Sequence, residues 1–108
     1  MKETGLGEFQ EIVLLAILIL DENAYGAKIQ SEMSQRLGRM ISRGALHAAL
    51  TRLTQKHFIE STFGGATMER GGRRKRFYTV TNLGKSALND AKTIRDEMWT
   101  LVPKMNLQ

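Results

Sequence analysis

The 108-residue chain has no cysteine, one proline, one tryptophan and two histidines. Without cysteine, disulfide bonds, thiolate metal sites and cysteine nucleophiles are excluded. His47 and His57 do not form a metal-binding H-x-x-x-H pair, and no Ser/His/Asp grouping accompanies them. The residue inventory therefore argues against an enzyme, and we expect neither a metal nor another cofactor.

Long hydrophobic runs are also missing. The longest, from Ile12 to Leu20, has nine residues, whereas a membrane-spanning helix needs about twenty. Acidic residues precede this run, unlike the basic stretch that opens a secretory signal. We therefore expect a cytoplasmic protein that makes no contact with membranes.

Positive charge is concentrated in one part of the chain. The whole sequence carries a formal net charge of +5, but residues 1–35 sum to −4. Residues 36–76 contain ten basic and two acidic side chains, a net charge of +8. A basic surface of this kind favours polyanionic partners.

Three helices are predicted in the first half of the chain. Residues 9–20 are apolar on nearly every side, which indicates a helix buried between other elements. A second helix has apolar residues every four positions, a start capped by Asn23 and an end at Gly38. Its apolar residues are Tyr25, Ile29, Met33 and Leu37.

The third helix is predicted to begin after Ser42, which can cap it. Its apolar face consists of Leu46, Ala49, Leu50 and Leu53, at the spacing of one helix face. The opposite face carries Arg43, His47 and Thr51. This polar face is either a plain exposed surface or a surface that contacts DNA.

Two short β-rich runs, "FIESTF" at 58–63 and "RFYTV" at 76–80, are joined by a glycine-rich basic stretch. This pattern predicts a hairpin with a long tip. Thr81 can cap a last helix that runs to about Val102, where Pro103 stops it.

The predicted fold is mostly α-helical with a two-stranded β-hairpin, in the order of a winged helix-turn-helix followed by a C-terminal helix. We expect residues 1–80 to form the DNA-binding part and residues 81–108 to form a dimerisation helix, together in one compact unit. A helix fits the major groove of double-stranded DNA, and a basic hairpin beside it reaches the flanking backbone.

The candidate DNA contacts come from three places. Those of the third helix are Ser42, Arg43, His47 and Thr51, and those of the hairpin tip are Arg70, Arg73, Arg74 and Lys75. Next to a recognition-helix pattern, the basic tip favours phosphate contact over an ordinary solvated loop; Arg76, which follows it, starts a strand. Tyr25, at the start of the second helix, is either an anchor for that helix or a contact to the DNA backbone.

Most of the chain resembles PadR-family transcriptional regulators. "GEFQEIVLLAILILDENAYGAKI" is similar to their opening helix and the "YG" that starts the second. "ISRGALHAALTRLTQKHFIES" resembles their recognition-helix segment, and "GGRRKRFYTVTNLGK" resembles their wing, second strand and Thr-capped last helix. The resemblance implies a homodimeric repressor that binds a near-palindromic operator and is often released by a small aromatic or hydrophobic effector.

The recognition-helix segment departs from the family pattern at two positions. Family members usually carry Tyr where this chain has His47, and often Pro where it has Ala48. Base or phosphate contacts of the family at that turn are therefore not transferred to this chain.

The last helix carries a short heptad seam. Its members, spaced 4, 3, 4 and 3 residues apart, are Ala87, Ala91, Ile94, Met98 and Leu101. The seam either packs on the first helix of the same chain or joins two subunits. We expect both, with the first and last helices of two subunits meeting across a twofold axis.

Trp99 follows the seam residue Met98. It is either part of the dimer core or a flat surface on which an effector stacks between subunits, with the flexible Met98 beside it. The sequence also leaves open a winged helix that binds an acidic partner protein, and RNA binding through the adjacent aromatics Phe77 and Tyr78.

Overall fold

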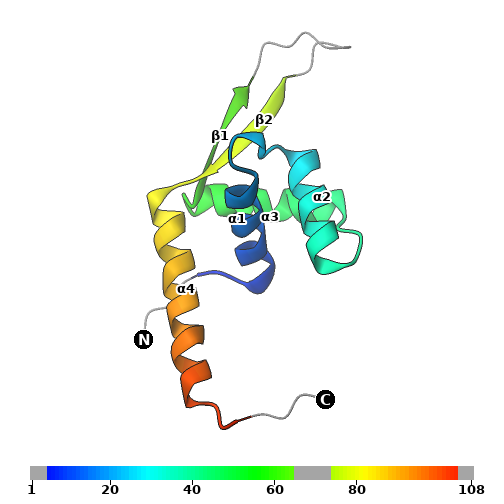
Figure 1. Ribbon diagram of the computed structural model, residues 1–108. Helices are drawn as coiled ribbons and strands as arrows, with labels where there is room; N and C mark the ends of the chain where they lie inside the picture. Colours follow the sequence, from blue (N-terminus) through cyan, green and yellow to red (C-terminus); the bar gives the residue numbers. More distant parts are fainter. Residues whose placement is uncertain (1–4, 65–73, 105–108) are drawn as a thin grey trace.

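The computed structural model describes residues 5–64 and 74–104, which form four α-helices and one two-stranded hairpin in the order that the sequence predicts (Figure 1). The elements are α1 (Glu8–Leu20), the short 3₁₀ turn η1 (Asp21–Asn23), α2 (Gly26–Leu37), α3 (Arg43–Gln55), β1 (Ile59–Gly64), β2 (Lys75–Val80) and α4 (Asn82–Leu101). The predicted winged helix-turn-helix with an added C-terminal helix is confirmed.

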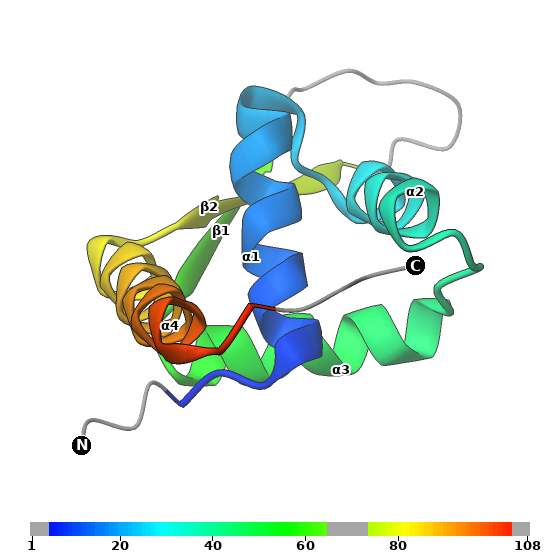
Figure 2. The same cartoon turned by 60° about the horizontal axis from the view of Figure 1, so that its bottom comes forward.

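Helix α1 stands at the centre of the molecule, with α2, α3 and α4 around it (Figure 2). Val13, Leu14 and Ile17 have almost no exposed surface. The opposite face of α1 keeps Leu15, Leu18 and Ile19 between 40% and 56% exposed. The helix that the sequence predicts to be buried is thus covered on one side only, and an apolar stripe remains on the other.

Helix α2 starts differently from the prediction. Its N-terminal residue is preceded by Tyr25, and no side chain caps it. The expected cap at Asn23 is wrong, because Asn23 belongs to η1 and the chain turns there before the helix begins. The predicted end is confirmed: Gly38 adopts φ +67°, a left-handed conformation that glycine reaches without strain.

Helix α3 is fixed at its start by a short turn from α2. The Ile41 amide donates to Ser34 Oγ at 3.0 Å, and Gln30 Nε2 donates to the Ile41 carbonyl at 2.7 Å. Ser42 then caps α3, because its Oγ accepts a hydrogen bond of 3.1 Å from the Ala45 amide. This confirms the predicted cap and sets the direction of α3 relative to α2.

Strands β1 and β2 pair antiparallel, with Ile59 opposite Val80 at the base and Gly64 opposite Lys75 at the far end. Ile59 and Val80 are buried in the core. The hairpin projects away from the helices (Figure 1), so its far end stands at one extremity of the molecule.

Helix α4 leaves the body in the opposite direction (Figure 1). Thr81 Oγ1 accepts a hydrogen bond of 3.0 Å from the Gly84 amide, which confirms the predicted cap. Ala87 and Leu88 are buried, whereas the C-terminal turns extend beyond the body and end at Leu101, before Pro103. Among the helices within the two described ranges, none has the length and hydrophobicity that a membrane crossing requires.

Candidate nucleic-acid interface

The outer face of α3 presents Arg43, His47 and Thr51, and all three side chains are exposed. The opposite face is buried, so the helix cannot turn these side chains inward without exposing its leucines to water. Ser42 is also exposed, but its oxygen already accepts the Ala45 amide. Ser42 can still donate its hydroxyl hydrogen to a ligand, and one lone pair of its oxygen is free to accept a second hydrogen bond.

Two grooves run along the two sides of α3. A groove of about 320 Å³ lies against α2 and is lined by Gln30, Arg43 and His47. A second groove, of about 260 Å³, lies against the hairpin and is lined by His47, Thr51 and Arg76. His47 lines both grooves, which makes it the ridge residue of this face.

Tyr78 of β2 also lines both grooves. Burial raises the pKa of its phenol above the ordinary value, and the nearby positive charge of Arg76 opposes this shift. The phenol is therefore neutral at physiological pH and is able to donate or accept a hydrogen bond. The sequence does not place Tyr78 beside the third helix. Side chains alternate along a strand, so the sequence indicates only that one of the adjacent aromatics Phe77 and Tyr78 faces the core.

The far end of the hairpin carries Arg74 and Lys75, which are both exposed. Arg70 and Arg73, two further candidates from the sequence, lie outside the described residues. Arg76 reaches across to β1, where its guanidinium carbon lies 4.6 Å from the centre of the ring of its cross-strand partner Phe63. Because Arg76 also lines a groove next to α3, the structure adds it to the basic side chains near this face.

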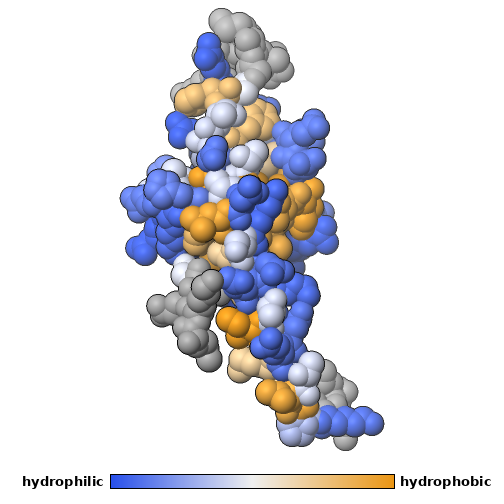
Figure 3. Space-filling view, turned by 90° about the vertical axis from the view of Figure 1, so that its left-hand side faces the viewer, coloured by the Kyte–Doolittle hydropathy of each residue, from blue (hydrophilic) through white to orange (hydrophobic). Residues whose placement is uncertain are grey.

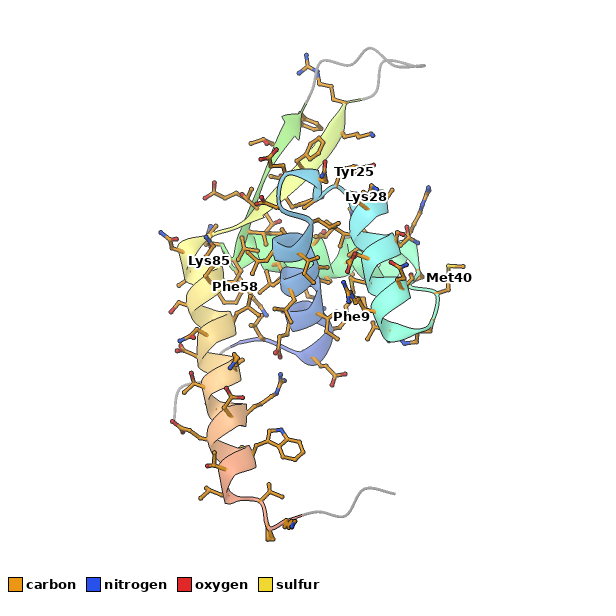
Figure 4. All side chains as sticks on the ribbon, in the orientation of Figure 1. Phe9, Tyr25, Lys28, Met40, Phe58 and Lys85 are labelled. Atoms are coloured by element: carbon orange, nitrogen blue, oxygen red, sulfur yellow. The ribbon has the colours of Figure 1, made fainter. Side chains whose placement is uncertain are left out.

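Tyr25 is half-buried between the start of α2 and the hairpin (Figure 4). Its ring meets the Phe77 ring edge-on, with centroids 5.4 Å apart, and the Lys75 ammonium lies 4.3 Å from its centre. Of the two alternatives for Tyr25, these contacts match a helix anchor. They also bring the candidates Tyr25 and Lys75 into contact with each other.

A second surface lies between α1 and α4. A groove of about 530 Å³ there is lined by Leu15, Leu18 and Trp99, with the buried Glu11 at its side. Arg95 donates a hydrogen bond of 2.5 Å to Glu11 Oε2, and this bond and the carboxylate charge raise the pKa of Arg95. Glu11 Oε1 is buried and has no partner among residues 5–64 and 74–104.

The heptad seam of α4 is divided between two environments. Ala87 and Ala91 are buried against the core of this chain and Ile94 is half-buried, whereas Met98 and Leu101 are 62% and 82% exposed. Trp99 is 60% exposed. Figure 3 shows hydrophobic residues gathered on this protruding end of α4. In the part of the chain that the structure covers, no group of His, Asp or Glu side chains is arranged to hold a metal ion.

A comparison with protein families assigns this arrangement of helices and hairpin to a known family. The profile of the "Transcriptional regulator PadR-like family" matches residues 14–90, from α1 through the hairpin into α4. The chain belongs to the PadR-like family. PadR-like proteins are transcriptional regulators rather than enzymes, which confirms the resemblance and the expectation that the chain is not an enzyme.

The chain is also similar to individual proteins and to solved structures. An uncharacterized protein from Lysinibacillus sphaericus is 36% identical over 86 residues, which cover 78% of this chain and 74% of the relative. Among solved structures, a PadR-like transcription factor from Bacteroides fragilis matches with a TM-score of 0.69 at 20% identity, over 86% of this chain and 84% of that one.

Two further structures share the fold. A PadR family transcription regulator from Clostridium difficile R20291 gives a TM-score of 0.64 at 23% identity, covering 86% of this chain and 93% of that one. The complex structure of hsRosR-S4 gives a TM-score of 0.60 at 28% identity, covering 90% of this chain and 72% of that one. These matches extend over the helices and the hairpin, so the PadR-like winged-helix fold applies to nearly the whole chain.

Proposed function

We propose that this PadR-like chain is a homodimeric, sequence-specific repressor that binds a near-palindromic operator in double-stranded DNA. The observation that carries the proposal is the exposed face of α3, where Arg43, His47 and Thr51 stand beside the cationic strand β2. Because the proposed partner is genomic DNA, we also propose that the protein is cytoplasmic.

In this proposal α3 enters the major groove. Arg43 is in the first turn of α3 and reads base edges, since an arginine there can bond both acceptors of a guanine. His47 and Thr51 follow on the same face at intervals of one turn. Arg74 and Lys75, with Arg70 and Arg73 of the adjoining segment, contact phosphates, which fix the position of the protein without reading sequence.

Dimerisation is supported by the apolar surface that one chain leaves uncovered. Leu15, Leu18 and Ile19 on α1 and Met98 and Leu101 on α4 are each at least 40% exposed. Exposed apolar patches that exceed the usual size on a monomer mark interaction sites in soluble proteins, and this supports an interface here. A dimer also has a functional reason, because one recognition helix reads too few base pairs, and two half-sites about one helical turn apart give a palindromic operator.

The proposal extends to release by a small hydrophobic or aromatic effector at Trp99 and Met98. The groove between α1 and α4 supports it, because Trp99 presents an aromatic face beside Leu15 and Leu18. Met98 does not line that groove and would contribute only from the subunit interface. Effector binding at the interface would change how the two recognition helices are spaced, and thereby the affinity for DNA.

A mobility-shift titration with the DNA upstream of the gene, run against unrelated DNA at two salt concentrations, tests the proposal. We expect tighter binding to the upstream fragment, a dimer by sedimentation, and repression of a reporter placed behind that fragment. Absence of binding to any DNA, together with capture of an acidic protein, would instead support the protein-interaction alternative. Binding to RNA in preference to DNA would also overturn the proposal.

A further inference from the structure

Tyr25 joins two parts of the molecule that are far apart in the sequence. Its carbonyl accepts the first helical hydrogen bond of α2, from the Ile29 amide at 2.9 Å. Its backbone also pairs with Phe77 of β2 in an isolated antiparallel bridge. One residue therefore belongs to the start of α2 and to the edge of the hairpin at once.

The hydrogen bond of this bridge is made by the residues beside it. The Tyr78 amide of β2 donates to the Ala24 carbonyl at 2.8 Å, and Ala24 is fully buried. The hairpin is thus held along its edge by the segment that leads into α2, in addition to its attachment at the base.

Aromatic packing continues the junction across the hairpin. The Phe77 ring meets the Tyr25 ring on one side and lies over Gly64 of β1 on the other. A Cβ atom at Gly64 would stand 2.5 Å from Phe77 Cδ1, so the ring occupies the space of a side chain there. The Lys75 ammonium rests 4.3 Å from the centre of the Tyr25 ring and is held by the attraction between a cation and an aromatic face.

The junction is linked through α2 to α3, the helix that we propose to read DNA. From Tyr25, α2 leads to Ser34 and Gln30, whose side chains hold the backbone of Ile41. Ile41 precedes Ser42, the cap of α3. The hairpin is therefore linked to α3 in two ways, by the direct contact of β1 with α3 and through Tyr25 and α2.

We propose that Tyr25 is a positioning residue for the wing, which is the hairpin formed by β1 and β2. Through its ring, Tyr25 fixes the hairpin and its cationic end relative to α3, so that both engage one duplex, and its hydroxyl makes no contact with DNA that binding requires. The proposal rests on the proposed function where it concerns DNA, but the junction itself can be measured without DNA.

The test uses the full chain and three variants. Tyr25→Phe keeps the ring and removes only the hydroxyl. Tyr25→Leu keeps an apolar side chain but removes the aromatic face, and Gly64→Ala pushes the Phe77 ring away from its place without touching Tyr25. Thermal unfolding, recorded for each, verifies that the variants are folded.

The first readout is hydrogen exchange of the Tyr78 amide in the absence of DNA. Tyr25→Phe should keep the protection of the wild type, while Tyr25→Leu and Gly64→Ala should exchange faster at Tyr78 but not at amides within α3. Unchanged protection at Tyr78 in both of these variants would overturn the junction, whatever the protein does with DNA.

The second readout is affinity for a duplex selected from random sequence by the wild-type protein, over a series of salt concentrations. Tyr25→Phe should bind as the wild type does. Tyr25→Leu and Gly64→Ala should bind more weakly, and the slope of log K against log salt should fall by about 0.9 for each phosphate that the wing no longer neutralises. A weakening in Tyr25→Phe equal to that in Tyr25→Leu would identify Tyr25 as a DNA contact through its hydroxyl and overturn the positioning role.

Selection of no duplex by the wild type would refute the proposed function instead. In that case the exchange readout alone decides whether Tyr25 holds the hairpin. The two failures are therefore distinguishable.

Discussion

Arg95 of α4 donates a hydrogen bond of 2.5 Å to Glu11 of α1, and Glu11 is the only charged side chain among the buried residues of the described chain. The bond lies where α4 begins to leave the body, so it fixes the helix that we propose for dimerisation. Glu11 Oε1 has no partner within the described ranges, and the carboxylate therefore depends on Arg95 for the interaction that offsets its burial.

Arg95→Ala should lower the free energy of unfolding, because it leaves a buried carboxylate without its partner. Lys92→Ala is the matched control: Lys92 pairs with Asp96 on the same helix, but both side chains are exposed. An exposed pair at this spacing contributes about 0.3–0.5 kcal/mol. Urea titration should show a decrease in stability for Arg95→Ala that exceeds the control severalfold.

The same experiment includes a rescue. Adding Glu11→Leu to Arg95→Ala removes the orphaned carboxylate, and stability should recover, since an apolar pair can replace a buried ion pair. A double variant as unstable as Arg95→Ala would show that the arginine acts through packing rather than through Glu11.

Two glycines in helices should respond to alanine in opposite directions. A Cβ at Gly84 would stand 2.3 Å from the Phe58 carbonyl oxygen and 2.8 Å from Val80 Cγ1, so Gly84→Ala should destabilise by about 1–3 kcal/mol. A Cβ at Gly44 meets nothing within 4 Å, and Gly44→Ala should stabilise α3 by about 0.5–1 kcal/mol. Equal shifts of the two unfolding midpoints would contradict the close approach of α4 to Phe58.

The relation of sequence to structure is clearest at the helix starts. Ser42 and Thr81 were predictable caps, because a cap is decided within three residues of the chain. Asn23 looks equally suitable in sequence, but the segment after it is drawn to β2 by the bond from Tyr78 to Ala24. The residues near each helix start predicted two caps correctly. The third prediction was wrong, because a hydrogen bond between residues far apart in the sequence determines where α2 begins.

The candidate surfaces divide in the same way. The helical period predicted the exposed face of α3, since Arg43, His47 and Thr51 oppose the buried leucines. The period alone could not separate Ala91, which is buried in its own chain, from Leu101, which is exposed, because that depends on where the body ends beneath α4. The contact of Tyr25 with Phe77 could not be predicted either, since these two residues are far apart in the sequence.

The wing prediction concerns phosphate contacts. Arg73→Ala with Arg74→Ala should weaken binding to all DNA alike and lower the slope of log K against log salt by about one for each phosphate left without its arginine. Lys92→Ala removes a positive charge from α4 and should leave the slope unchanged. Filter binding to operator and random duplexes measures both, and an unchanged affinity of the double variant for both duplexes would exclude the wing as a phosphate contact.

The dimer prediction uses the exposed end of the seam. Leu101 is 82% exposed in one chain, so Leu101→Asp should cost a monomer little but should bury an unpaired charge in an interface, at several kcal/mol. Sedimentation should then show monomers with weakened operator binding. Thr100→Asp adds the same charge to a neighbouring exposed position one helical step away and should remain dimeric. Retention of the dimer in Leu101→Asp would remove this end of α4 from the interface.

The last prediction separates reading of the operator from attachment to DNA. Arg43 is the first residue of α3, and its side chain is exposed beside the groove that α3 forms with α2. If Arg43 bonds a guanine, Arg43→Ala should cost about 1–3 kcal/mol on the operator and much less on random DNA, and the preference for that base should relax. Arg43→Lys keeps the charge but not the planar pair of donors, so it should recover the affinity for random DNA without recovering the base preference. Titration of operator duplexes substituted at each position measures both quantities. An equal weakening on operator and random DNA in Arg43→Ala would make Arg43 a phosphate contact and would leave His47 and Thr51 as the residues of α3 that read the sequence.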